Sequence, residues 1–143
     1  MDNPLVFDIS EIASKPQGTT TVYTLNDPVE FDDPEVKTVG NMKGEVTIMT
    51  IDREFNVQIR DIEVDVECEC SKCLEKFTHK VQIPFAEKQY VIDKRNREER
   101  EEVGYVDTKY QTIDTTELFR QEIILHFPFI PVCSTRCNGI NQG

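Results

Sequence analysis

Residues 55–70 read FNVQIRDIEVDVECEC, and the alternation within them decides the fold. The apolar side chains of the first third fall on one face of an extended strand, and from Ile62 onward they fall with the opposite parity. The first set is Phe55, Val57 and Ile59, and the second is Ile62, Val64, Val66 and Cys68. Because strand side chains repeat every two residues, this change predicts a bulge or bend at Arg60-Asp61.

Two further β-rich runs flank this strand. Residues 38–51 precede it, and the connection at 52–54 is short enough for a hairpin. Residues 77–85 follow it with five side chains in phase, namely Phe77, His79, Val81, Ile83 and Phe85. Pro84 cannot donate to a ladder of hydrogen bonds, so we expect this strand at a sheet edge or at a bulge. Three long runs with short connections predict an antiparallel meander.

One helix is predicted near the C-terminal end. Asp114 and Glu117 have the spacing of a capping box, and Pro128 ends the helix. Its apolar residues cover most of the circumference, so we expect heavy burial; they are Leu118, Phe119, Ile123, Ile124, Leu125 and Phe127. The remaining chain predicts short strands at 6–12 and 22–25 and an acidic loop at 26–35.

The predicted fold class is α+β in a single domain, residues 1–143. We expect an antiparallel, strongly bent sheet or a partly open β-barrel, with one C-terminal helix packed on it. Residues 93–103 carry charge throughout and no apolar stripe. They predict a solvated loop or a mobile helix.

The composition disfavours several classes of protein. The formal net charge is −11 and the sequence pI is about 4.6. Such acidity disfavours broad adhesion to nucleic acid, because phosphate binding depends on lysine and arginine. No stretch approaches the roughly 20 apolar residues of a membrane-spanning helix. The first residues lack the basic segment of a signal peptide, so we expect a cytoplasmic protein without membrane partners.

Enzyme motifs are also missing from the sequence. There is no glycine-rich nucleotide loop, no HExxH and no nucleophile elbow, and the chain has only two histidines, His79 and His126. The chain is therefore poorly equipped for most acid/base chemistry, and we expect a protein that is not an enzyme, in agreement with the family resemblance described below.

Five cysteines form two clusters, and four of them have the spacing of metal ligands. Cys70 and Cys73 form a CxxC, and Cys133 and Cys137 form a CxxxC. Two such pairs supply the tetrahedral sulfur shell of structural Zn²⁺ and leave no open position for catalysis. The alternatives are packed thiols, a disulfide or redox pair, or an iron–sulfur site. Cys68 has the parity of the buried face, so we expect it in the core.

The segments that carry these cysteines resemble the YceD family, the large ribosomal RNA subunit accumulation proteins. Residues 70–77, CSKCLEKF, are similar to the family pattern CxRCLxxF, with Lys72 where many members have arginine. Residues 113–139 are similar to the pattern idl.elv.eeilL.lP..P.C...C.G, although many members continue into further cysteines after the glycine. The resemblance covers about residues 40–140.

This resemblance implies a role in the synthesis, processing or accumulation of 23S rRNA, and hence in assembly of the large ribosomal subunit, without reaction chemistry of its own. Candidate contact residues are Lys72, Lys76 and Arg136 beside the cysteines. The partner is either rRNA or a basic large-subunit ribosomal protein, since an acidic factor suits the latter.

Two other functions stay open at this point. A thiol redox protein would use Cys70 and Cys73. An acidic interaction domain unrelated to ribosomes would use a row of carboxylates on the long strand, consisting of Glu63, Asp65, Glu67 and Glu69.

The cysteine spacing predicts that the reduced protein, purified natively and freed of loose metal, carries about one zinc per chain. Metal analysis by mass spectrometry measures this ratio. A value below about 0.2 zinc per chain would contradict the four-cysteine site.

Overall fold

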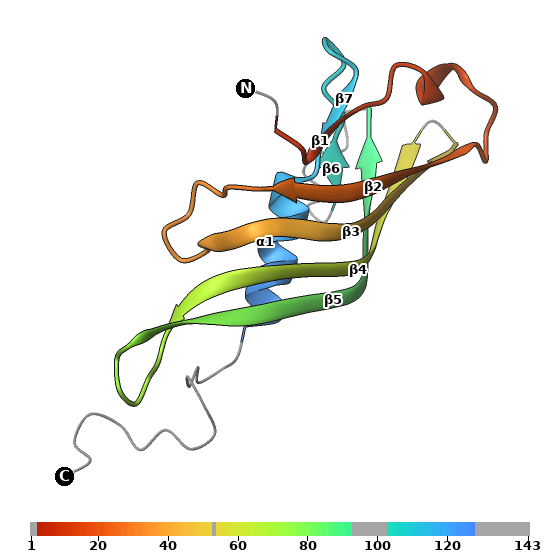
Figure 1. Ribbon diagram of the computed structural model, residues 1–143. Helices are drawn as coiled ribbons and strands as arrows, with labels where there is room; N and C mark the ends of the chain where they lie inside the picture. Colours follow the sequence, from red (N-terminus) through yellow and green to blue (C-terminus); the bar gives the residue numbers. More distant parts are fainter. Residues whose placement is uncertain (1–2, 53, 93–102, 128–143) are drawn as a thin grey trace.

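The computed structural model describes residues 3–52, 54–92 and 103–127, and most of them lie in β-strands (Figure 1). The main sheet has the order β2-β3-β4-β5-β6, in which β2 to β5 pair antiparallel in sequence order. Its strands are β2 (Thr20–Pro28), β3 (Thr38–Ile51), β4 (Glu54–Glu69), β5 (Lys76–Val91) and β6 (Gly104–Tyr105). The meander of the three long strands, β3 to β5, agrees with the prediction, whereas the pairing of β2 with β3 was not predicted. The short strand β6 departs from the predicted antiparallel meander, because it pairs parallel to β5.

A second, two-stranded sheet and one α-helix complete the described residues. The small sheet pairs β1 (Val6–Asp8) with β7 (Thr112–Asp114), and a 3₁₀ turn, Ile12–Ser14, follows β1. Helix α1 (Thr116–Leu125) lies against one face of the main sheet, which we call the inner face, and crosses behind its strands in Figure 1. The opposite face is the outer face.

The main sheet is open and not a barrel. β2 lies at one edge, and β5 with the short β6 lies at the other, with no pairing between the two edges in the described residues. Of the two predicted forms, the bent sheet is therefore correct.

The predicted bulge in β4 is confirmed. The pairing of β3 with β4 shifts there, so that Asp61 and Ile62 lie opposite the single residue Gly44. Asp61 takes a positive φ of 51°. The apolar side chains on both sides of the bulge are at most 3% exposed, in the sets Phe55, Val57, Ile59 and Ile62, Val64, Val66. One extra residue thus keeps both halves of β4 on the inner face.

Strand β5 bends at the same level, and this corrects the predicted position of Phe85. Pairing between β4 and β5 keeps one register throughout, so Pro84 falls opposite Asp61. Figure 1 shows β5 turning sharply near its middle. The buried parity changes there, with Ala86 inside and Phe85 44% exposed. Phe85 lies on the outer face, where the Arg60 guanidinium is 5.1 Å from the centre of its ring.

The prediction that Pro84 lies at a sheet edge is confirmed. Among the described strands, only β6 pairs with the second side of β5, and it does so only at Tyr90 and Val91. The missing N–H of Pro84 is therefore compatible with the sheet.

The start of α1 corrects the predicted capping box. The residue that precedes the helix is Thr115, which is fully buried and whose hydroxyl donates to the carbonyl oxygen of Leu5 at 2.7 Å. Asp114 accepts a hydrogen bond from the N–H of Thr116 at 2.9 Å and lies one position further out than expected. The helix start is therefore held by a local bond from Asp114 and by a long-range bond between Thr115 and the N-terminal segment.

The burial of α1 is also narrower than predicted. Leu118, Phe119 and Ile123 are buried, whereas Leu125 is 73% exposed. The helix thus has one buried face, and Pro128 lies outside the described residues.

Other predictions are confirmed in part. The strand at 22–25 is longer, as β2, and the acidic loop is shortened to 29–37. Most of the charged run at 93–103 lies outside the described residues. In the described part of the chain, no helix has the length and apolar character needed to cross a membrane.

We predict that Gly44→Ala lowers the free energy of unfolding by about 3 kcal/mol. Gly44 has a φ of 153°, and an added methyl group would lie 3.0 Å from both the Arg60 carbonyl oxygen and the Ile62 Cα. Gly40→Ala is the matched control, because Gly40 has a φ of 75° but nothing within 4 Å of an added methyl group. Urea denaturation should give a loss of about 1 kcal/mol for this control. Equal losses would contradict the packing role of Gly44.

Candidate functional site

The hairpin of β4 and β5 extends beyond the rest of the sheet. β3 pairs with β4 only as far as Val66, and one further hydrogen bond joins the Glu67 N–H to the Lys37 carbonyl. Beyond that point β4 pairs with β5 alone, up to Glu69 opposite Lys76. Figure 1 shows this arm projecting from the body of the molecule. We call residues 70–75 the hairpin tip.

The hairpin tip is a tight turn built around Cys70. The Cys70 N–H donates to the Glu75 carbonyl oxygen at 2.8 Å, and the Leu74 N–H donates to the Cys70 carbonyl oxygen at 2.9 Å. The Cys73 N–H points at the Cys70 sulfur, with a nitrogen–sulfur distance of 3.5 Å. Leu74 closes the turn with a positive φ of 64°. The turn thus holds both cysteines in place through backbone groups.

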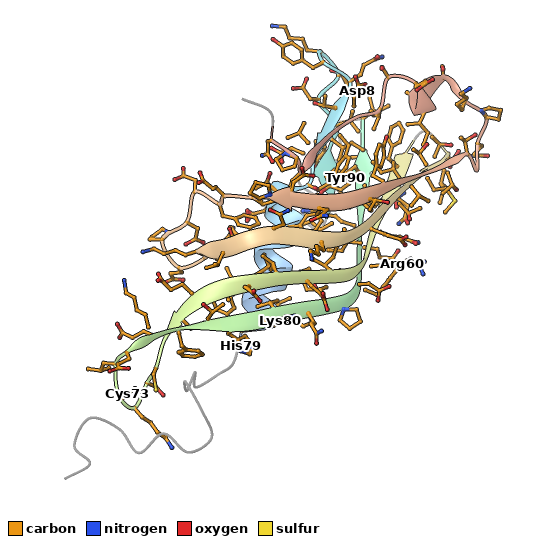
Figure 2. The ribbon with its side chains drawn as sticks, viewed as in Figure 1. Asp8, Arg60, Cys73, His79, Lys80 and Tyr90 are labelled. Atoms are coloured by element: carbon orange, nitrogen blue, oxygen red, sulfur yellow. The ribbon has the colours of Figure 1, made fainter. Side chains whose placement is uncertain are left out.

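This geometry suits a pair of thiolate ligands. A backbone N–H that points at a sulfur fixes the position of that sulfur within the turn, as a metal ligand requires. Cys70 has no exposed surface, and Cys73 is half-buried at the tip (Figure 2). Two such sulfurs on one turn are half of a tetrahedral Zn²⁺ shell.

The structure brings together two of the four predicted metal ligands. Cys133 and Cys137 lie outside the described residues. Within 3–52, 54–92 and 103–127, no three side chains of histidine, cysteine, aspartate or glutamate gather into a metal-binding group. The four-cysteine site therefore stays a prediction.

Cys68 differs from Cys70 and Cys73 in its surroundings, because it packs against the hydrophobic core. It is partly buried against the core, and burial raises the pKa of its thiol. A raised pKa keeps the thiol protonated near neutral pH, which makes it a weak ligand and a weak nucleophile. Cys68 was predicted in the core, and the structure places it at the margin of the core, partly buried.

The predicted contact lysines lie at the tip and are exposed. Lys72 stands within the turn, between the two cysteines, and Lys76 begins β5. Arg136 lies outside the described residues. Because the arm projects from an otherwise acidic protein, these two lysines reach away from the body of the molecule.

The acidic row of β4 is diluted by its neighbours. Glu63, Asp65 and Glu67 point to the outer face, as predicted. Across the strand pair, Asp65 faces Lys80 and Glu69 faces Lys76. Glu63 accepts a hydrogen bond from the Gln82 side-chain amide at 3.0 Å. The outer face of the arm is therefore mixed in charge, which weakens it as a dedicated site for a basic partner.

Sequence reasoning missed the part that Leu74 plays. Its side chain is 55% exposed, and its backbone takes a conformation that L-residues rarely adopt. The available signal was its position directly after the CxxC, where the turn must reverse the chain.

The fold and the hairpin tip define a mostly β protein, built on an open bent sheet, with a pair of cysteines at the end of its longest hairpin. The chain matches the large ribosomal RNA subunit accumulation protein YceD family over residues 60–143, and it belongs to that family. The match begins at the bend of β4 and includes the arm and α1. Searches of curated proteins and of solved structures found no match.

We predict that Leu74→Pro disrupts the tip while Leu74→Gly preserves it. Proline cannot take a φ near 64° and has no N–H to donate to the Cys70 carbonyl, whereas glycine satisfies both requirements. Thermal unfolding should show a loss of about 2 kcal/mol or more for the proline variant only. Similar losses for the two variants would show that the turn geometry does not matter.

Proposed function

We propose that this protein is a non-enzymatic factor that supports accumulation of 23S rRNA and assembly of the large ribosomal subunit. The observation that carries the proposal is membership of a family described by accumulation of large-subunit ribosomal RNA, over a match that includes the arm and the helix. Such a factor works where ribosomes assemble, in the cytoplasm. The fold supports a binding role, because its most distinctive feature is a projecting arm.

We further propose a structural zinc at the arm. Cys70 and Cys73 would supply two ligands from the hairpin tip, and Cys133 and Cys137 would supply the other two. The hydrogen bond from the Cys73 N–H to the Cys70 sulfur supports this assignment. When bound, zinc would cross-link the tip of the arm to the chain that follows α1 and so stiffen the contact surface.

The thiol redox alternative has less support from the geometry. Cys70 has no exposed surface, so only the partly exposed Cys73 could attack a disulfide substrate in this conformation. The CxxC also lies in a hairpin turn and not at the start of a helix, where a helix N-terminus lowers the pKa of a thiol.

The arm suggests how an acidic protein engages a ribosomal precursor. A net charge of −11 repels the phosphate backbone at long range. Lys72 and Lys76 lie at the end of the projecting arm, where a local contact keeps the acidic body at a distance. Contact with rRNA through these lysines and Arg136 is one route. Contact between the acidic surface and a basic large-subunit ribosomal protein is the other.

Sedimentation of a cell lysate on a sucrose gradient tests the proposal. We expect the tagged protein to migrate with precursors of the large subunit and to stay with them at moderate salt. The double variant Lys72→Glu, Lys76→Glu should leave these fractions at lower salt than the wild type. The matched control is Lys15→Glu, Lys109→Glu, which makes the same change of charge at exposed positions away from the arm.

The outcomes separate the two routes. If rRNA is the direct partner, loss of two phosphate contacts lowers the slope of log affinity against log salt by about 2. If the partner is a basic protein, added negative charge leaves binding unchanged or strengthens it. Wild-type protein that is found only at the top of the gradient, at low salt as well, would contradict association with precursors.

A further inference from the structure

The two long edges of the main sheet differ sharply in their side chains. The free edge of β5 carries Pro84 in its middle and lysines along its length, at Lys76, Lys80 and Lys88. Lysine and proline on an edge strand discourage another strand from pairing with it. The edge of β2 has neither a charged residue nor a proline from Thr20 to Asn26. One edge is therefore protected against pairing, and the other is not.

The backbone of β2 offers a regular row of hydrogen-bonding groups at this edge. Thr50 donates its N–H to the Thr19 carbonyl at 3.0 Å, and the pairing of β2 with β3 keeps that register from Thr20 to Pro28. Because antiparallel strands alternate, the backbone groups of the even residues point away from β3. These residues are Thr20, Val22, Thr24 and Asn26, and all four are exposed. Within the described residues, no backbone hydrogen bond reaches this side of β2.

The sequence of this edge is nearly symmetric about Val22. Residues 20–24 read TTVYT, so a strand that runs antiparallel to an identical strand, with Val22 at the centre, meets a close copy of itself. Thr20 then lies opposite Thr24 of the partner subunit, and Val22 lies opposite the partner's Val22. Threonine pairs and valine pairs are favourable cross-strand neighbours. An interface between identical subunits across a two-fold axis requires this kind of self-complementarity.

We propose that the β2 edge pairs with the β2 edge of a second copy of this chain, across a two-fold axis at Val22, to form a dimer with one continuous sheet. Three residue pairs would exchange about six backbone hydrogen bonds, since each such pair exchanges two. The Val22 side chain, which is 57% exposed in one copy, is covered in the dimer. This proposal does not depend on the proposed function.

The charge distribution favours self-association through the β2 edge over self-association through other surfaces. Two copies that each carry a net charge of −11 repel one another over most approaches. In the proposed register no acidic residue lies opposite another, because Asp27 falls opposite Gln17 of the partner subunit. The interface is small, so we expect a dissociation constant on the order of micromolar.

Sedimentation velocity over a hundredfold range of concentration, reaching roughly 200 µM, measures the association. The mass of the wild type should rise from 16.6 kDa toward twice that value. Val22→Lys places two like charges opposite one another and should weaken the dimer at least tenfold. Val39→Lys is the matched control, because Val39 is 46% exposed on the outer face of β3, away from the edge. A wild type that stays monomeric, or an equal effect of both variants, would overturn the proposal.

Cysteine cross-linking tests the register in the full chain. Val22→Cys should give a disulfide-linked dimer, because Cα atoms in a directly opposed pair are about 5.5 Å apart. In Thr24→Cys the two new cysteines are offset by about 13 Å along the strands, which is too far for a disulfide. The native cysteines are the same in both variants, so a difference in reducible dimer comes from the new residue. Equal cross-linking of the two variants, or none in Val22→Cys, would contradict an axis at Val22.

Discussion

The packing of Ile62 over Gly44 is the contact on which the rest of this structure depends. Two residues of β4 lie opposite one residue of β3 at this point. A methyl group on Gly44 would collide with the Ile62 Cδ1 and would lie only 3.0 Å from two backbone atoms of the bulge. The bulge changes the direction of the sheet and resets the parity of β4. Both halves of β4 therefore bury apolar residues on the inner face, the odd-numbered residues before the bulge and the even-numbered residues after it. Strand β5 follows because it stays in register with β4 through the bend.

The arm begins beyond the bend, at the point where β3 ends. β3 pairs with β4 on both sides of the bulge, from Ile51 opposite Glu54 to Thr38 opposite Val66. Past Val66, β4 and β5 continue alone and finish in the cysteine turn, and α1 lies behind the broad part of the sheet between the bend and the arm (Figure 1). Two strands alone are weakly stable in water, so the tip of the arm needs further interactions to hold its shape. The backbone hydrogen bonds around Cys70 supply some of these interactions.

Much of this arrangement could be predicted from local patterns. The alternation in residues 55–70 located the bulge, and Pro84 located the sheet edge, because both follow from the geometry of a single strand. The CxxC located the turn at the arm. The phase of Phe85 could not be predicted, since its face depends on a bend imposed by the neighbouring strand. The helix start was wrong for a similar reason. Thr115 is held by Leu5, which is 110 residues away in sequence.

The sequence by itself determined the order of the three long strands, the position of the bend, the pair of cysteines at the hairpin and the family, because each depends on residues close together in the chain. Only the tertiary structure decided that the sheet stays open, that the arm extends beyond β3, and that one edge carries lysines while the other is uncharged from Thr20 to Asn26 and unpaired within the described residues. These features depend on where distant strands end relative to one another. That relation is set by the packing of Gly44, Ile62 and the core, and no local pattern contains it.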